Sequence, residues 1–231
     1  MVKALIELTG RASEVLREEG MGSVLRRGLS CGLSIVRSWF FVSRNFYLYE
    51  HILGDGNEAD FLPKISNFTF NIVSSNEEAD ALATSTGIDF RKQFVNSWKR
   101  LEKGAIAFCI FIDGEAAHTG WVALNEEAGK SVDSLPYKID FENGEACTGA
   151  TGTLTKYRGK GLMVYGYFKR FQFLSEKGVK ISRNAVDVKN IASQRAHAKF
   201  NHKIYARARY MKILRWKFWK EIPVPQVKRC D

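Results

Sequence analysis

Two short segments of the sequence, residues 149–163 and residues 186–193, contain residues that could bind an anion or move protons. The first segment has the pattern of a strand, a glycine-rich turn and the start of a helix. Backbone N–H groups at a helix start are unpaired and lie at the positive end of the helix dipole. Arg158 and Lys160 add positive charge. The turn is therefore a candidate phosphate site.

The two common nucleotide-binding loops do not fit this turn. A Walker A loop needs Gly at position 154 and Ser or Thr at 161, where this chain has Leu154 and Gly161. A dinucleotide fingerprint needs Gly or Ala where the chain has Val164. Neither nucleotide-binding loop therefore describes this turn.

The turn resembles the pyrophosphate loop of the GCN5-related N-acetyltransferases (GNAT), which reads Arg or Gln, two residues, Gly, one residue, then Gly or Ala. Arg158 and Gly161 match this pattern, and Met163 departs from it. Residues 186–193 resemble the family's next signature, in which a strand ends before Asn190 and a small residue, Ser193, follows three positions later. The chain is thus identified as a divergent GNAT member over residues 68–220.

The resemblance implies acetyl-coenzyme A, or another acyl-coenzyme A, as cosubstrate, and no metal. The residues that would hold its pyrophosphate are Arg158, Gly159, Lys160, Gly161, Leu162 and Met163. The strand before the turn, including Thr153, would pair with the pantetheine arm where two parallel strands splay apart. Asn190, with Ser193, would contact the pantetheine or the loop. As a plain helix cap, however, Asn190 needs no ligand.

The implied reaction is direct attack of an amine on the thioester, which requires a base and a proton donor for the thiolate. The family often places a Tyr four residues after the small residue, and here that position is His197. His197 is one candidate donor, or else an outward polar residue on a basic helix; Tyr205 is a second candidate. Glu145 is the candidate base, with Glu142 close by, and either could instead be a surface residue.

The pattern of the chain predicts an α+β fold with a mixed central sheet flanked by helices. Strands are expected over residues 68–73, 105–112, 115–124, 139–154 and 179–188, and as a closing pair over 204–218. Helices are expected from residue 77 and over 89–101, 162–176 and 191–203, and residues 125–138 are expected to form a loop. Asp113-Gly114 marks the clearest hairpin.

Four segments are expected along the chain. Residues 1–50 form an amphipathic helical extension, 51–66 a linker, 67–222 the GNAT-like acyltransferase domain and 223–231 a basic C-terminal tail. Residues 21–42 are basic and amphipathic, with no charge-free run of about 18 residues, so they are not expected to span a membrane. They could lie on an anionic membrane, pack on their own domain, or pack on a second copy in a homodimer.

Charge supports a second interpretation. The formal net charge is +10, and residues 195–231 alone carry +9, from eleven Lys or Arg against two acids. The leading hypothesis is a cytoplasmic acyltransferase that is peripheral at the inner membrane face. It would act on an amine-bearing acceptor and would have no nucleic-acid partner. The alternative is a non-catalytic GNAT-fold module whose basic C-terminal strands bind nucleic acid or anionic lipid.

Overall fold

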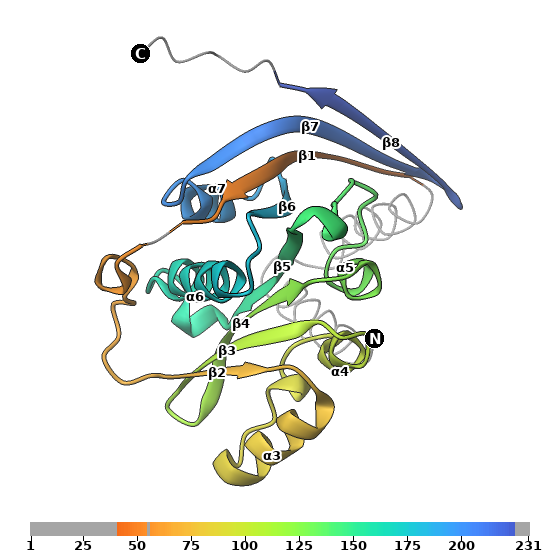
Figure 1. Ribbon diagram of the computed structural model, residues 1–231. Helices are drawn as coiled ribbons and strands as arrows, with labels where there is room; N and C mark the ends of the chain where they lie inside the picture. Colours follow the sequence, from red (N-terminus) through yellow and green to blue (C-terminus); the bar gives the residue numbers. More distant parts are fainter. Residues whose placement is uncertain (1–40, 55, 225–231) are drawn as a thin grey trace, which may run out of the picture. The chain divides into compact units, whose positions relative to one another are not determined.

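The computed structural model describes residues 41–54 and 56–224. Within them, the chain divides into a larger compact unit, residues 45–208 with 221–224, and a smaller one, residues 41–44 with 209–220. The described strands form one eight-stranded mixed sheet in the order β2-β3-β4-β5-β6-β1-β7-β8 (Figure 1). The predicted fold class, a mixed sheet flanked by helices, is confirmed.

The elements follow the chain in the order predicted, with additions at the start and in the middle. The strands are β1 (Phe41–Ile52), β2 (Thr69–Val73), β3 (Ile106–Ile112), β4 (Glu115–Ala123), β5 (Glu145–Thr153), β6 (Ile181–Asp187), β7 (His202–Ile213) and β8 (Trp216–Pro223). The α-helices are α3 (Asn76–Thr86), α4 (Ser97–Glu102), α5 (Glu126–Val132), α6 (Leu162–Glu176) and α7 (Ile191–His197). Short 3-10 turns are η1 (Glu58–Phe61), η2 (Phe90–Lys92), η3 (Phe141–Asn143) and η4 (Thr155–Tyr157).

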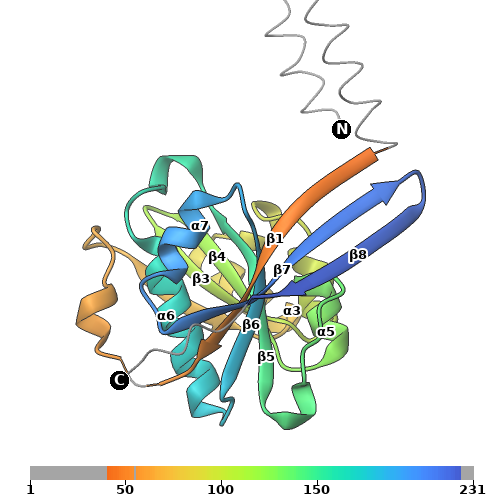
Figure 2. The ribbon, with the colours of Figure 1, turned by 90° about the horizontal axis from the view of Figure 1, so that it is seen from above.

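Alternating residues of the central strands build a core on each face of the sheet. On β3, Cys109 and Phe111 belong to the cluster that the 3-10 turn η2 and helices α3–α5 cover. Phe108 and Ile110 point to the opposite face, where they meet side chains of α6. Figure 2 shows α6 and α7 on one side of the strands and α3 and α5 on the other. The period of two in each strand thus separates the two layers.

Strands β5 and β6 form the parallel pair that the resemblance predicted. They pair only from Glu145 opposite Ile181 to Cys147 opposite Arg183, and then part. Beyond that point β6 continues to pair with β1 as far as Asp187, while β5 continues beside β4. A bulge interrupts the β4–β5 ladder opposite residues 150 and 151, and Ala150 has a positive φ of 45°. The two strands therefore splay next to a bulge.

Three expectations about individual segments are wrong. Residues 41–50, expected as helix, form most of β1, because Phe46, Leu48 and Tyr49 are buried in the sheet. Residues 126–132, expected as loop, form α5, whose start is capped by the Asn125 side chain accepting from Ala128 N–H. The helix expected over 89–101 is a short 3-10 turn, η2, followed by α4.

The N-terminal prediction is tested only in part. Residues 1–40, which hold most of the expected amphipathic extension, lie outside the described residues, as do residues 225–231 of the expected tail. Within the described part of the chain, no helix has the length and apolar character needed to cross a bilayer. The predicted division into four segments remains a prediction.

Candidate functional site

The glycine-rich turn leads directly into the N-terminus of α6, as predicted. Gly161 is the N-cap residue with φ 86°, and no side chain caps this helix end. The positive φ favours glycine, and a Cβ at position 161 would also be tight, at 3.3 Å from Pro63 Cα. The first N–H groups of α6 have no partner within the helix and so remain available to an anion.

The residues predicted to bind pyrophosphate divide into two kinds. Arg158, Gly159 and Lys160 are exposed, and Arg158 Nε donates to the carbonyl of Thr153 at 3.3 Å. Leu162 is buried and Met163 packs against the core, so both can contribute only their backbone amides. The backbone holds the turn through Lys64 N–H, which donates to Lys160 C=O at 2.9 Å.

Hydroxyl groups line the strands where β5 and β6 part. Thr148 and Ser182 are buried and their hydroxyls hydrogen-bond at 2.9 Å. Thr153, predicted to contact the cosubstrate, hydrogen-bonds His118 Nδ1 at 2.7 Å. His118 is fully buried, and burial lowers its pKa to about 3, so it is a neutral strand histidine.

Glu145 and Tyr205 are brought together by Arg183. Arg183 donates to both Glu145 carboxylate oxygens at 2.6 Å and also pairs with Glu50. Its guanidinium carbon lies 4.7 Å from the centre of the Tyr205 ring. Burial alone would raise the pKa of Glu145, but the hydrogen bonds from Arg183 outweigh it and the pKa lies below its usual value. Burial raises the pKa of Tyr205 to about 12.

His197 lies on the other face of the sheet, away from this cluster. The alternative that it is an outward polar residue is wrong, because its exposed fraction is 0%. Its Nε2 is 2.9 Å from Asn184 Nδ2, and its Nδ1 is 2.9 Å from His51 Nε2. Burial, followed by the nearby His51 and Arg170, lowers its pKa to about 2. His197 is therefore held neutral within a hydrogen-bonded network.

Asn190 caps α7. Its side chain accepts a hydrogen bond from Ser193 N–H at 3.1 Å, and Ser193 is buried. This cap alone explains why Asn190 and Ser193 occur at these positions, without a ligand. Their contact with a cosubstrate remains a prediction.

Arg170 is a residue of the site that sequence reasoning missed. It is fully buried on α6, and Nη1 donates to Thr151 Oγ1 at 3.2 Å beside the bulge. Nη2 has no hydrogen-bond partner among the described residues, and the guanidinium carbon lies 3.9 Å from the centre of the Tyr167 ring. A Cβ at Gly120, opposite the bulge, would lie 2.6 Å from the guanidinium carbon, so glycine makes room for the cation. The sequence signal that could identify Arg170 is a cation within the buried helical stripe formed by Leu162, Gly166, Arg170 and Leu174.

Within the described part of the chain, His, Cys, Asp and Glu side chains form no group of three or more that could hold a metal ion. Both described cysteines, Cys109 and Cys147, are buried free thiols.

Comparison with known proteins bears on the fold. No family model matches the sequence. No curated protein matches it either. Among solved structures, a GCN5-related glucosamine N-acetyltransferase region of a fungal multi-domain GH3 β-N-acetylglucosaminidase matches with a TM-score of 0.51 and 12% identity, covering 79% of this chain and 22% of that one. The chain has the GNAT fold, which confirms the resemblance at the level of the fold.

Two further structures match with lower scores. A GCN5-related N-acetyltransferase-like protein from Streptococcus suis is 12% identical, with a TM-score of 0.47 and coverage of 80% of this chain and 67% of that one. A GNAT-family acetyltransferase from Colwellia psychrerythraea is 16% identical, with a TM-score of 0.46 and coverage of 75% and 63%. The chain spans about three-fifths of the length of several matched structures.

Proposed function

We propose that this protein transfers an acyl group from acyl-coenzyme A to an amine. The observation that carries the proposal is the separation of the parallel strands β5 and β6 after Cys147 and Arg183, together with the uncapped N-terminus of α6 at the far end of β5. An extended thiol-bearing arm can pair with strand edges that have parted. A pyrophosphate can bind at the adjoining helix start.

The cosubstrate would be held by backbone and charge together. The amides of residues 161–163 would bind the pyrophosphate, while the exposed Arg158 and Lys160 would add charge-assisted contacts. The pantetheine arm would follow β5 from Thr153 toward the bulge, with Asn190 and Ser193 at the start of α7 on the other side. The thioester would then lie beside Ala150 and Thr151.

Charge at the bulge would stabilise the tetrahedral intermediate. A bulge leaves a residue outside the ladder, so its backbone is available to hydrogen-bond the thioester oxygen. Arg170 places a buried positive charge next to Thr151. Its burial lowers its pKa, but an Arg side chain stays charged in proteins. An oxyanion forming there would be stabilised electrostatically.

Tyr205 is the proton donor that we propose for the departing thiolate. Burial raises the pKa of its phenol to about 12, so Tyr205 holds its proton at neutral pH but is a weaker acid than an ordinary thiol. His197 is enclosed and neutral, and Glu145 has both oxygens engaged by Arg183. Their predicted catalytic roles gain no support from these contacts, and we propose structural roles for both.

The proposed acceptor is an amine, and amino sugars are the first to test, because the matched fungal region is named as a glucosamine N-acetyltransferase. The experiment is acetyl-coenzyme A turnover, followed by release of the free thiol, with glucosamine and a panel of small amines. Amine-dependent thiol release that falls in Tyr205→Phe would support the proposal. A folded protein that releases no thiol with any amine would argue for a binding role.

The proposed compartment is the cytoplasm, where acyl-coenzyme A is available, with residues 21–42 as a membrane contact and a homodimer as the alternative use of that segment. Residues 21–40 lie outside the described part of the chain, so these proposals rest on the sequence. Removing residues 1–40 should release the protein from anionic vesicles if this segment is the anchor.

A second candidate function is favoured by one observation. Along β8, Trp216 and Phe218 are 62% and 47% exposed; Lys217 lies between them, and Lys220 follows two residues after Phe218. Exposed aromatics with cations suit an anionic lipid surface. Trp216→Ser with Phe218→Ser should then lower vesicle binding, whereas unchanged sedimentation would remove this candidate.

A further inference from the structure

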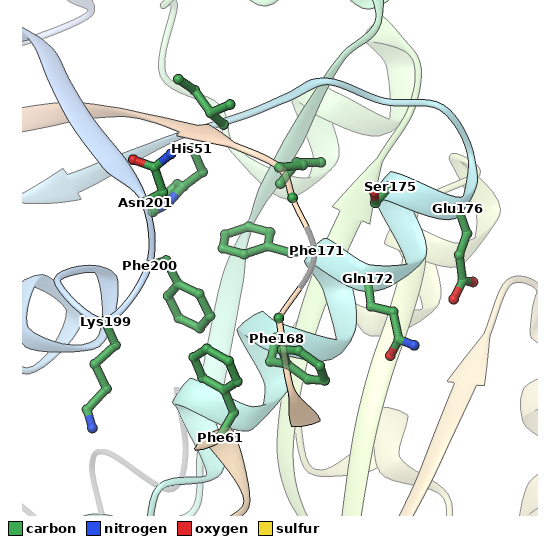
Figure 3. Close-up of a pocket in the computed structure, with 14 residues that line it drawn as sticks. His51, Phe61, Phe168, Phe171, Gln172, Ser175, Glu176, Lys199, Phe200 and Asn201 are labelled. Carbon is green, nitrogen blue, oxygen red and sulfur yellow. The ribbon is translucent and has the colours of Figure 1, made fainter. Parts of the chain in front are cut away.

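A pocket with a volume of about 450 Å³ lies beside the start of β7, within the larger unit. The C-terminal half of α6 forms one side of the pocket, and Glu176 is the acidic residue there. Residues 199–201, which join α7 to β7, form the facing wall, as Figure 3 shows. The pocket therefore adjoins the first residues of β7.

The first residues of β7 present an open backbone edge. Val224 N–H donates to the carbonyl of Tyr205 at 3.1 Å, so Tyr205 directs its backbone polar groups toward the side of β8. Because these groups alternate in direction along a strand, Lys203 directs its N–H and C=O to the same side. The described part of the chain ends at Val224, opposite Tyr205, so among the described residues no strand covers β7 on that side at Lys203. Such an edge is a template for a further strand.

The register of the β7–β8 hairpin determines which residues would come next along this edge. A turn of two residues joins the strands, and counting from that turn places Val224 opposite Tyr205, in agreement with the hydrogen bond. The same count places Gln226 opposite Lys203 and brings Lys228 beside the pocket wall of residues 199–201. A continuation of β8 would therefore lead directly to the pocket.

The positions of the prolines suit this continuation. Since Val224 N–H points toward β7, the backbone nitrogens of Pro223 and Pro225 point away from β7. Prolines at these positions remove no hydrogen bond from the ladder, whereas Gln226 and Lys228 keep N–H groups on the β7 side. Outward prolines also hinder the addition of another strand. The segment after Val224 can therefore pair with β7 as an edge strand.

The side chains favour the same pairing. In this register Pro225 lies opposite Ile204 and Val227 lies opposite His202, and directly opposed residues point to the same face of a sheet. Ile204 and His202 are half-buried in the described structure. Two apolar side chains placed beside them would remove further apolar surface from water.

We propose that residues 225–228 continue β8 along the edge of β7 and that residues 229–231 then cover the pocket. The occupant of this surface is thus a segment of the chain itself. Extended at about 3.3 Å per residue, the three residues after Lys228 can reach across roughly 10 Å. Arg229 would bring a positive charge to the pocket that Glu176 lines. This surface is separate from the proposed cosubstrate cleft, and the inference does not depend on that cleft.

Hydrogen exchange at the Lys203 amide, followed by NMR in the full-length protein, tests the pairing. Gln226→Pro removes an N–H on the β7 side, whereas the matched control, Val227→Pro, changes a nitrogen that points outward. The Lys203 amide should exchange slowly in the natural protein and in Val227→Pro, and at least about tenfold faster in Gln226→Pro. Fast exchange in the natural protein, or equal exchange in the two variants, would overturn the proposal.

Two further measurements test the place and the source of the segment. Nile red, a neutral apolar dye, should fluoresce about twofold or more brightly with Gln226→Pro than with Val227→Pro, because the pocket loses its cover. Equal fluorescence would overturn the assignment to the pocket. Protection of the Lys203 amide should not depend on protein concentration. Loss of that protection on dilution would show that the added strand comes from a second copy and would overturn the pairing within one chain.

Discussion

Arg183 donates two hydrogen bonds of 2.6 Å to the carboxylate of Glu145, one on each oxygen. The pair stands on the last stretch where β5 and β6 run side by side, since Arg183 is opposite Cys147 in the final paired position. Both side chains are largely buried. This ion pair bridges β5 and β6 over the residues where the two strands still pair.

Glu145→Gln should therefore destabilise the fold. The substitution removes a charge-assisted, bidentate contact and leaves Arg183 with Glu50, so unfolding free energy should fall by about 2 kcal/mol. Chemical denaturation at neutral pH measures this change. Glu142→Gln, on the exposed 3-10 turn nearby, is the matched control and should leave stability unchanged. A stable Glu145→Gln variant with lost turnover would restore the predicted role of Glu145 as base.

Stability should fall as pH is lowered from about 7.5 to 5, before most carboxylates titrate. His51, His118 and His197 have pKa values lowered to about 3, 3 and 2. Below the ordinary histidine pKa of about 6.5 the unfolded chain therefore binds more protons than the folded one, which favours unfolding. The loss at pH 5 should be roughly 1 to 2 kcal/mol per histidine.

Denaturant unfolding at several pH values measures this loss. His118→Gln should reduce this loss of stability by the contribution of one histidine, roughly 1 to 2 kcal/mol. A stability that does not change over this range would contradict the buried, neutral state of the three rings.

Arg170→Met should lower turnover while sparing both the fold and cosubstrate binding. Among the described residues, no hydrogen bond or ion pair joins Arg170 to a carboxylate, but its guanidinium lies 3.9 Å from the centre of the Tyr167 ring and donates two hydrogen bonds, so an apolar replacement should lower stability by about 1 to 2 kcal/mol. Loss of a charge at the developing oxyanion should lower kcat about a hundredfold. Steady-state kinetics and calorimetry separate the two effects.

Lys169→Met is the matched control on the neighbouring residue, whose ammonium pairs with Glu58 away from the bulge. Its kcat should stay near that of the natural protein. Equal kcat values for the Arg170 and Lys169 variants would contradict a catalytic role for Arg170.

Asn190→Ala should cost about 1 kcal/mol of stability, because the cap on Ser193 N–H is lost. Asn190→Asp keeps an acceptor and should retain stability. If Asn190 also contacts the cosubstrate, as the motif predicts, Asn190→Asp should weaken acetyl-coenzyme A binding although the fold is unchanged. Unchanged affinity would limit Asn190 to capping.

Local signals predicted much of this fold. The Asp113-Gly114 turn joins β3 and β4, and both residues have the positive φ values, 51° and 74°, that such a pair tolerates. Helix α6 has the predicted bounds, because its apolar period is regular and glycines precede and follow it. The cap at Asn125, followed by Glu126 and Glu127, is a local helix-start signal for α5, although residues 125–138 are predicted as a loop.

Contacts between distant segments were not predictable from such signals. Strand β1 lies between β6 and β7 in the sheet and pairs with β6, where Tyr49 lies opposite Asn184. These partners are distant in sequence and cannot be identified from residues 41–50 alone. The turn of the site was identified because its chemistry is contiguous in sequence. The partners of Glu145 and His197, Arg183 and His51, come from segments far away. The sequence therefore located the turn, and the structure shows which distant side chains contact Glu145 and His197.

The most direct test of the proposed function is calorimetric titration of the full-length protein with acetyl-coenzyme A, beside Lys160→Glu and Lys180→Glu. Both lysines are exposed, but Lys160 lies in the turn and Lys180 precedes β6 at the far end. Saturable binding by the natural protein and Lys180→Glu, weakened at least about tenfold in Lys160→Glu, is the predicted result. No binding by the folded natural protein, or equal affinity in the two variants, would contradict the cosubstrate site.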